Sequence, residues 1–204
     1  MKRGGRGGFT LFLVLASALL SPAGGLEAEG GGSLVGTVTW GPQRLNNVVV
    51  YIEKVEGTFR PPEEAAVMDQ KNLTFVPHVL PILIGTTVDF VNGDGVLHNL
   101  HAFLERETLF NIAMPKFLKK KSMAFQREGV VLLLCDVHKE MSAYIVVLQN
   151  PFFAVTNERG EFVIKDIPPG SYTLRTWHEK LKPQSRQVQL KEGDEVTVDF
   201  QLRN

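Results

Sequence analysis

The run Val-Val-Leu-Leu-Leu-Cys-Asp-Val-His-Lys-Glu-Met, residues 130–141, is the most informative stretch of the chain. Its uninterrupted apolar part, Val130–Cys135, predicts a buried β-strand. That strand ends on the only cysteine, and an imidazole and a thioether follow at His138 and Met141. A thiolate, an imidazole and a thioether this close together are three soft or borderline ligands for one metal ion. The stretch therefore predicts a β-fold that carries a metal site at the end of a strand.

A second imidazole is available upstream, in the segment His-Asn-Leu-His at residues 98–101. Two histidines, one cysteine and a weak axial methionine form a set that selects copper and builds a one-electron centre. The alternative is a small buried thiol near a strand end, with the histidine and methionine as ordinary loop and core residues. A single cysteine cannot form an internal disulfide, so metal ligation would explain a lone thiol in an exported protein.

The first residues have the pattern of a leader. Lys2, Arg3 and Arg6 precede the uncharged run Phe9–Leu20, and small residues follow. This pattern predicts a signal peptide over residues 1–28 and a periplasmic or secreted protein, the alternative being an uncleaved membrane anchor. No later segment is long and apolar enough to span a bilayer, so no transmembrane segment is expected after leader cleavage. The 22 basic and 22 acidic residues balance, and nothing suggests binding to nucleic acid.

The rest of the chain has the pattern of short strands separated by turns. Gly-Pro, Asn-Gly-Asp-Gly, Pro-Pro-Gly and Glu-Gly-Asp punctuate β-branched and apolar runs, which favours β-sandwiches over helical folds. No segment has the pattern of a strong amphipathic helix. Glu105–Leu118 is expected to be a helical turn or a loop. The expected strands are Leu34–Trp40, Val48–Glu53, Thr86–Asn92, Val130–Cys135, Ala143–Leu148, Glu161–Lys165, Ser171–Trp177, Gln187–Leu190 and Glu195–Leu202.

Two distant segments resemble the two halves of one known module. Gly-Thr-Val-Thr (36–39) and Leu-Asn-Asn-Val-Val-Val-Tyr-Ile (45–52) resemble the opening of carboxypeptidase-regulatory-like, or transthyretin-like, modules. The run Thr-Asn-Glu-Arg-Gly-Glu-Phe-Val-Ile-Lys-Asp-Ile-Pro-Pro-Gly-Ser-Tyr-Thr-Leu (156–174) resembles their second half. A module split in this way would be interrupted by the part of the chain that carries the metal motif.

We therefore expect residues 33–59 and 150–204 to form one discontinuous β-sandwich, with a second domain, residues 60–149, inserted into it. Insertion is well tolerated where the two ends of a loop lie close together. The alternative is two domains in series, 33–149 and 150–204. Pairing of the strand at 48–53 with the strand at 161–165, rather than with the strand at 143–148, would favour the insertion.

The metal motif itself resembles that of cupredoxins. The Cys-x2-His-x2-Met spacing and His-Asn-x-His are most similar to amicyanin, then to plastocyanin and pseudoazurin. The wider segment, from Met-Asp-Gln-Lys-Asn-Leu-Thr-Phe-Val-Pro-His (68–78) through Trp-His-Glu (177–179), looks like the methylamine utilisation protein-like cupredoxins that are fused to such a β module. The resemblance implies an all-β chain: a Greek-key cupredoxin β-sandwich plus a small transthyretin-like β-sandwich, after a signal peptide.

The resemblance also implies which residues hold the metal. It makes His98, Cys135, His138 and Met141 the ligands of one copper ion per chain, with the ring edge of His138 as the port for electrons. Asn99 would tie the two ligand loops together from outside the ligand set. Two further histidines remain possible ligands or neighbours of the metal, namely His101 and His78.

The function implied is that of an exported mononuclear type 1 (blue) copper protein. It would carry single electrons between redox proteins, such as a cytochrome or an oxidoreductase, and would not itself be an enzyme. The alternatives are periplasmic copper binding and handling without electron transfer, an enzyme with a vacant coordination position, and a metal-free binding scaffold. The last would be expected to have lost a ligand, and all four are present.

Charged residues near the motif depart from the amicyanin pattern. Asp136, Lys139 and Glu140 stand where amicyanin-like loops are apolar and rich in proline. Negative charge near copper should favour Cu(II) and lower the reduction potential. A second charged group is either a solvated turn or a patch that steers an acidic partner; it comprises Lys116, Lys119, Lys120 and Lys121.

Overall fold

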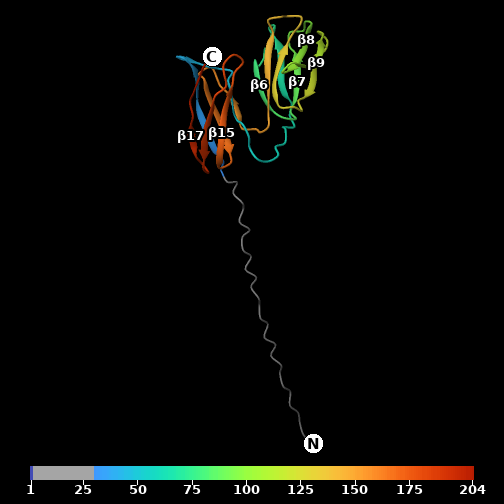
Figure 1. The fold of residues 1–204 in the computed structure, drawn as a ribbon. Helices are drawn as coiled ribbons and strands as arrows, with labels where there is room; N and C mark the ends of the chain where they lie inside the picture. Colours follow the sequence, from blue (N-terminus) through green and yellow to red (C-terminus); the bar gives the residue numbers. More distant parts are fainter. Residues whose placement is uncertain (2–29) are drawn as a thin grey trace.

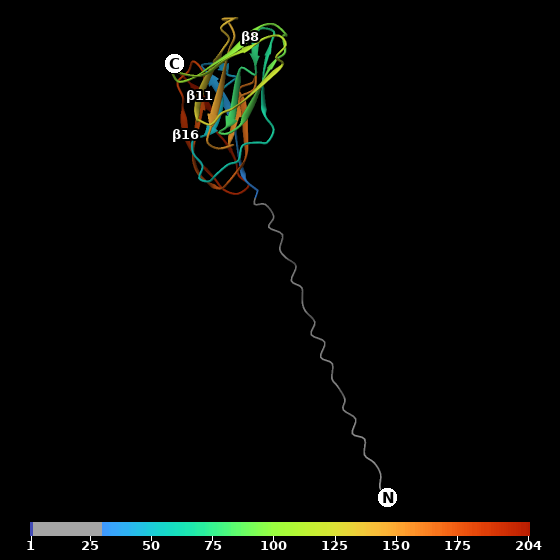
Figure 2. The same ribbon diagram turned by 90° about the vertical axis from the view of Figure 1, so that its right-hand side faces the viewer.

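The computed structural model describes Met1 and residues 30–204. Every named element in this part of the chain is a β-strand, and no helix there is long and apolar enough to cross a membrane. The strands form two β-sandwiches that stand side by side (Figure 1). After a quarter turn one sandwich lies in front of the other (Figure 2). The expectation of an all-β chain is confirmed, whereas the predicted signal peptide, apart from Met1, lies outside the described residues.

We call the first body the central sandwich; it contains strands β4 to β12. One of its sheets has the order β10-β7-β4-β5 and the other the order β6-β12-β11-β8-β9. Neighbours that are not consecutive in the chain, including the parallel pairs β4–β7 and β6–β12, are typical of a Greek-key arrangement. The strands are β4 (Ala66–Lys71), β5 (Thr74–Val76), β6 (Val79–Leu83), β7 (Thr87–Asn92), β8 (His98–Leu104), β9 (Glu107–Met114), β10 (Lys120–Ala124), β11 (Gly129–Leu134) and β12 (Ser142–Leu148).

The second body, the flanking sandwich, is built from both ends of the described chain. One sheet has the order β14-β1-β17, with β2 and β18 also paired to β1, and the other has the order β13-β3-β15-β16. Its strands are β1 (Gly32–Trp40), β2 (Gln43–Arg44), β3 (Val49–Ile52), β13 (Phe153–Val155), β14 (Glu161–Ile167), β15 (Gly170–Trp177), β16 (Ser185–Leu190), β17 (Glu195–Thr197) and β18 (Phe200–Leu202).

Each sandwich has its own apolar core. Met68, Phe90, Leu100, Leu133 and Ile145 are fully buried in the core of the central sandwich. The core of the flanking sandwich includes side chains from β1 and β3 together with side chains from β14 to β18. A smaller third cluster of buried residues joins the two bodies, with members from β3, β6 and β12.

The pairing of the early strands bears on the domain organisation. β3 pairs with neither of the two strands that were expected to decide the question; its neighbours are β13 and β15. β1 pairs with β14, β17 and β18. All of these partners follow residue 150, so the strands before residue 60 share sheets with the end of the chain. We therefore propose the discontinuous division, in which the central sandwich interrupts the flanking one.

One segment expected to be a helical turn or a loop is a strand. Glu105–Leu118, expected to be a helical turn or a loop, holds the strand β9, which pairs with β8 along its whole length from Leu104↔Glu107 to His98↔Met114. β9 is an edge strand, and its sequence Glu-Thr-Leu-Phe-Asn-Ile-Ala-Met mixes polar and apolar residues without a clean period of two. Such a strand gives little signal in the sequence because cross-strand pairing, rather than its own pattern, determines its conformation.

Candidate metal centre

His98 is placed by the alternation of strand β8. Successive side chains of a strand point to opposite faces, so His98 shares a face with Leu100, Ala102 and Leu104. All four are buried, and that face lies against the core of the central sandwich. His98 is the first residue of the strand, so its ring stands at the end of the core. His101 stands at an odd position between these residues, so its side chain is on the other face, where it is partly exposed.

Cys135 is placed in the same way by strand β11. Val131 and Leu133 are completely buried, and Cys135 continues their alternation one residue beyond the end of the strand. The thiol is therefore directed into the core end, where its residue is 2% exposed. The gold loop that follows, at the upper end of the central sandwich in Figure 1, brings His138 back over the thiol.

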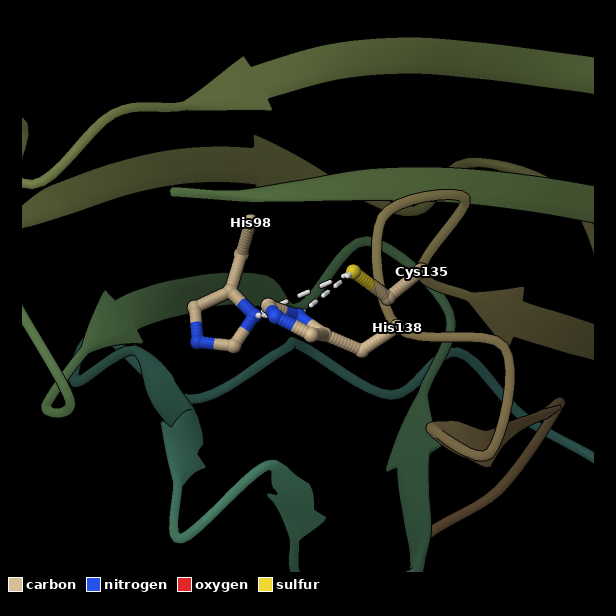
Figure 3. A group of neighbouring side chains, drawn as sticks. All are labelled: His98, Cys135 and His138. Carbon is tan, nitrogen blue, oxygen red and sulfur yellow. Dashed lines mark hydrogen bonds between the residues drawn. The ribbon is translucent and has the colours of Figure 1, made fainter. Parts of the chain in front are cut away.

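Three side chains from these two segments converge on one point (Figure 3). The Sγ atom of Cys135 lies 3.8 Å from Nδ1 of His98 and 3.8 Å from Nδ1 of His138. The two Nδ1 atoms are 3.1 Å apart. Atoms that share one first-row metal ion at bond lengths of about 2.0–2.3 Å lie about 3–4 Å from one another. The spacing and the donor set therefore fit a single bound ion.

The backbone of Met141 is hydrogen-bonded to the other two residues of the motif, His138 and Cys135. Its amide donates to the carbonyl of His138 at 3.0 Å, and its carbonyl accepts from the amide of Cys135 at 3.3 Å. The residue is buried and belongs to the same core cluster as Cys135. These two backbone hydrogen bonds hold Met141 next to the residues whose side chains converge, immediately before β12 begins.

A carboxylate fixes the far side of the His98 ring. Nε2 of His98 lies 3.1 Å from Oδ2 of Asp94, while the amides of Asn72 and Leu73 donate to Asp94 at 2.6 and 3.0 Å. Partial burial by itself would raise the pKa of Asp94, but the hydrogen bonds from Leu73, Asn72 and His98 outweigh it and hold the pKa below its usual value. The charged carboxylate keeps a proton on Nε2 and leaves Nδ1 free to bind a metal, as in carboxylate–histidine–metal triads.

Asn99 joins the two ligand-bearing segments. Its Oδ1 accepts from the amide of Asp136 at 2.6 Å, and its Nδ2 donates to Asn111 and to the carboxylate of Asp136, both at 2.9 Å. Its own carbonyl accepts from Gln70 at 3.2 Å. The side chain therefore links the start of β8 to the residue that follows Cys135, which is the position expected for it.

His101 lies outside the converging group. Its Nδ1 is 3.0 Å from both carboxylate oxygens of Asp136, and its ring packs against Phe103. The hydrogen bond from His101, with a further one from Asn111, holds the pKa of Asp136 below its ordinary value, against a smaller opposing effect of burial. His101 therefore contacts the metal centre only through Asp136 and Asn99.

His78 also lies outside the group, between the two sandwiches. Its Nδ1 is 3.1 Å from the carbonyl oxygen of Ser142, and its Nε2 is 3.3 Å from Oε1 of Glu179. The contact with Ser142 places it beside the residue that follows Met141. Within the described residues, the only group of three or more His, Cys, Asp or Glu side chains with the spacing of a metal site is His98, Cys135 and His138.

Two residues that hydrogen-bond to the site residues were not predicted to do so from the sequence. Asp94 stands in Asn-Gly-Asp-Gly, which was interpreted only as a turn; its position four residues before His98 was the available signal. Asp136 was noted as a charge that crowds the motif, but its hydrogen bonds to Asn99, Asn111 and His101 depend on the pairing of β8 with β9 and β11 and could not be inferred from spacing.

Comparison with known proteins finds one family model that matches the end of the chain. Residues 141–203 match the model of the carboxypeptidase regulatory-like domain. This range covers all the strands of the flanking sandwich that follow residue 150, and it also takes in β12 of the central sandwich. The strands β1 to β3, which pair with the matched region, lie outside the match. No match was found among curated proteins.

The solved structures that resemble part of the chain include amicyanins, a purple cupredoxin and a copper-containing nitrite reductase. The reduced state of an amicyanin mutant is 24% identical and covers 48% of this chain and 97% of its own, with a TM-score of 0.38. A purple cupredoxin from Nitrosopumilus maritimus is 24% identical over 40% of this chain and 98% of its own, with a TM-score of 0.35. A copper-containing nitrite reductase from Thermus scotoductus SA-01 is 22% identical over 48% of this chain and 25% of its own, with a TM-score of 0.38.

Both resemblances noted in the sequence thus recur in the comparisons. The argument about function rests on the side chains of the site itself.

Proposed function

We propose that this chain is an exported mononuclear type 1 copper protein that carries one electron at a time. The convergence of two imidazole nitrogens on a buried thiol is the observation that supports it most directly. His98, Cys135 and His138 would hold the ion, and Met141 would supply a weak axial thioether. Copper in such a set supplies a reversible one-electron couple.

The rigidity of the donor set supports electron transfer over copper handling. His98 and Cys135 are 0% and 2% exposed and sit at the ends of paired strands, and Asp94 and Asn99 hold the ring and the backbone around them. A site fixed in this way changes little between two oxidation states, which favours rapid electron transfer. A protein that delivers copper would instead need ligands that open to a recipient. His138, which is partly exposed, would be the port for electrons.

The surface around the port supports a protein partner. Four exposed apolar side chains lie on the loops that carry or adjoin the ligands: Val96, Leu97, Phe117 and Val137, with Phe117 80% exposed. The loop of Phe117 is held against the turn before His98, because Asn92 donates to the carbonyls of both Val96 and Met114. Exposed apolar groups gathered at one place are typical of an interaction site.

Lysines border this apolar surface on one side. Lys116 and Lys119 flank Phe117, and the ammonium of Lys119 lies 3.7 Å from the point where a β-carbon on Gly95 would stand. Lys120 is paired with Asp89 at 2.8 Å, so it contributes less free charge. We propose that the partner is a redox protein, either a cytochrome or an oxidoreductase, whose docking face carries negative charge on the corresponding side.

The test is spectroscopic. The purified protein is titrated with Cu(II) and its visible spectrum is recorded; we expect an intense thiolate-to-copper charge-transfer band at one equivalent of copper. Cys135→Ser should abolish the band because no thiolate remains, whereas His101→Ala should retain it. Copper bound with no such band in the unsubstituted protein would contradict the proposal.

A further inference from the structure

The contact between the two sandwiches reaches the metal-binding loop through one histidine. His78 precedes β6 of the central sandwich, and its ring lies between Ser142, at the start of β12, and Glu179, which follows β15 of the flanking sandwich. Nδ1 is 3.1 Å from the Ser142 carbonyl oxygen and Nε2 is 3.3 Å from the Glu179 carboxylate. Ser142 is the residue after Met141. Two hydrogen bonds, one between Glu179 and His78 and one between His78 and Ser142, therefore connect the flanking sandwich to the end of the metal-binding loop.

Both partners of the ring are hydrogen-bond acceptors. Nδ1 faces a carbonyl oxygen and Nε2 faces a carboxylate, and each of these groups can only accept a hydrogen bond. The ring therefore bridges two fixed acceptors, one next to the metal-binding loop and one on the flanking sandwich. Removing the carboxylate of Glu179 would leave the ring fixed on one side only.

Other contacts also fix the start of β12 against the flanking sandwich. The amide of Tyr144 donates to the carbonyl of His78 at 2.9 Å, and the Tyr144 ring lies edge-on to His78 at 5.7 Å. Trp177, two residues before Glu179, packs on Tyr144 at 5.2 Å. A buried apolar cluster continues the contact between β3, β6 and β12. The start of β12 is therefore fixed to the flanking sandwich as well as to its own sheet.

The position of Ser142 in turn determines the geometry of the loop. Its neighbour Met141 donates to the carbonyl of His138 at 3.0 Å and accepts from the amide of Cys135 at 3.3 Å. Any displacement of the first residue of β12 is passed to these two hydrogen bonds, which set the spacing between the cysteine, the histidine and the methionine. The chain from Glu179 to Cys135 is made only of direct contacts.

We propose that the flanking sandwich positions the metal-binding loop, with Glu179 and His78 acting as the positioning pair. The pair touches no metal ligand side chain; it acts through the Ser142 carbonyl. This inference deepens the proposed function and, as far as copper is concerned, rests on it. It gives the flanking sandwich a role in setting the geometry of the proposed metal site.

The charge state of Glu179 agrees with this role. Partial burial by itself would raise the pKa of Glu179, but the hydrogen bond from His78 and the nearby charge of Lys180 outweigh it, so the pKa lies below its ordinary value. Burial lowers the pKa of the neighbouring His178, whose Nδ1 accepts from the amide of Lys180. Burial, and then the nearby Glu179, raises the pKa of Tyr144.

The first test needs no metal. Amide hydrogen exchange is measured on the metal-free full chain for the unsubstituted protein, for Glu179→Gln and for Asp199→Asn. Asp199 is the matched control, because its carboxylate accepts from the amide and hydroxyl of Thr37, both at 2.8 Å, inside the flanking sandwich. We expect exchange at Cys135 and Met141 to rise at least about threefold, relative to amides of β8, in Glu179→Gln only. Unchanged relative exchange at these two amides would overturn the proposal.

The second test uses the copper-loaded protein. The midpoint potential and the electron paramagnetic resonance spectrum, which reports the axial ligand, should change in Glu179→Gln and stay unchanged in Asp199→Asn. In a His78→Gln background, where the positioning pair is already disrupted, Glu179→Gln should have no further effect on the potential or the spectrum. Equal shifts in both backgrounds would show that Glu179 acts by another route.

The two proposals fail in different ways. If the unsubstituted protein shows no thiolate-to-copper band, the proposed function is wrong, while the exchange experiment still decides whether the pair positions the loop. If the band is present but neither exchange nor potential responds to Glu179→Gln, the protein is a copper carrier and the flanking sandwich does not tune it.

Discussion

At the scale of single residues, the site is a small number of polar groups set at the end of an apolar core. His98 and Cys135 continue the buried alternation of β8 and β11, so the same side-chain period that builds the core also places the proposed ligands at its edge. The chemical identity of the site therefore depends on which residues occupy the last inward positions of two neighbouring strands. Their orientation depends on groups that lie outside the set, above all Asp94 and Asn99.

Replacing Asp94 by asparagine tests this dependence. Asp94→Asn removes the charge that holds a proton on Nε2 of His98, so the ring loses its fixed orientation. Loss of such an outer partner typically lowers metal affinity by about 10–100-fold, and we expect a loss in that range for copper, measured by competition with a chromophoric chelator.

Asp69→Asn is the matched control for this experiment. Asp69 accepts from the amide of Gly93 at 3.0 Å in the same turn but does not contact His98. Its substitution should change the stability of the turn while leaving copper affinity near that of the unsubstituted protein. An equal loss of affinity in both variants would mean that the turn as a whole, rather than the carboxylate on His98, is responsible.

At the scale of elements, the strands that the sequence revealed are those with a clear apolar run or a clear alternation. β11 and β12 were predicted nearly to their ends, because both are central strands of one sheet and are rich in Val, Ile and Leu. β9 was missed because it is an edge strand whose sequence mixes polar and apolar residues without a clean period of two. β17 and β18, expected as one strand over Glu195–Leu202, are two short strands that pair with different parts of β1.

The metal motif was predictable for a similar reason. Its spacing lies within one loop, so the positions of Cys135, His138 and Met141 are correlated in the sequence itself. A fourth donor from residues 98–101 was inferred from the donor set, but the choice of His98 came only from the resemblance, since nothing local relates residue 98 to residue 135. The hydrogen bonds of Asp136, and the position of His78 between the sandwiches, arise from sheet register and from the packing of two bodies, which local patterns do not encode.

The pairing of β7 with β10 gives a prediction about pH. Asp89 on β7 accepts from Lys120 at 2.8 Å and from Ser122 at 2.6 Å, both on β10. The hydrogen bond from Lys120, then that from Ser122, lowers the pKa of Asp89 in the folded protein. A carboxyl group with a lowered folded pKa stabilises the fold above its unfolded pKa, and this contribution is lost as the pH falls through the folded value.

We therefore expect the stability of the unsubstituted protein to fall more steeply in acid than that of Asp89→Asn. The measurement is the urea midpoint of both proteins between about pH 5 and pH 2. At neutral pH, Asp89→Asn should be the less stable of the two. Parallel midpoint curves for the two proteins over this range would contradict the prediction.

At the scale of the whole molecule, the two ends of the described chain meet in one sandwich. β1 and β3 contribute to the flanking core, and apart from the short strand β2 their partners come from beyond residue 150. The central sandwich lies between these segments in the sequence and has a core of its own. This arrangement gives the flanking sandwich two covalent connections and one packed interface with the central sandwich, which suits it to hold that body in a fixed geometry.

Substitution of Ile52 distinguishes the two domain divisions. Ile52, on β3, is 1% exposed and packs in the core of the flanking sandwich, so Ile52→Ala should cost about 2–5 kcal/mol. Under the discontinuous division, residue-resolved hydrogen exchange should show protection lost mainly in β14, β15 and β16. Strands β8 and β11 should keep theirs, because their core does not include Ile52. If residues 33–149 formed one domain instead, the loss would appear in β8 and β11 while the end of the chain stayed protected. Leu133→Ala, which removes a buried side chain from the central core, is the reciprocal control and should give the opposite pattern.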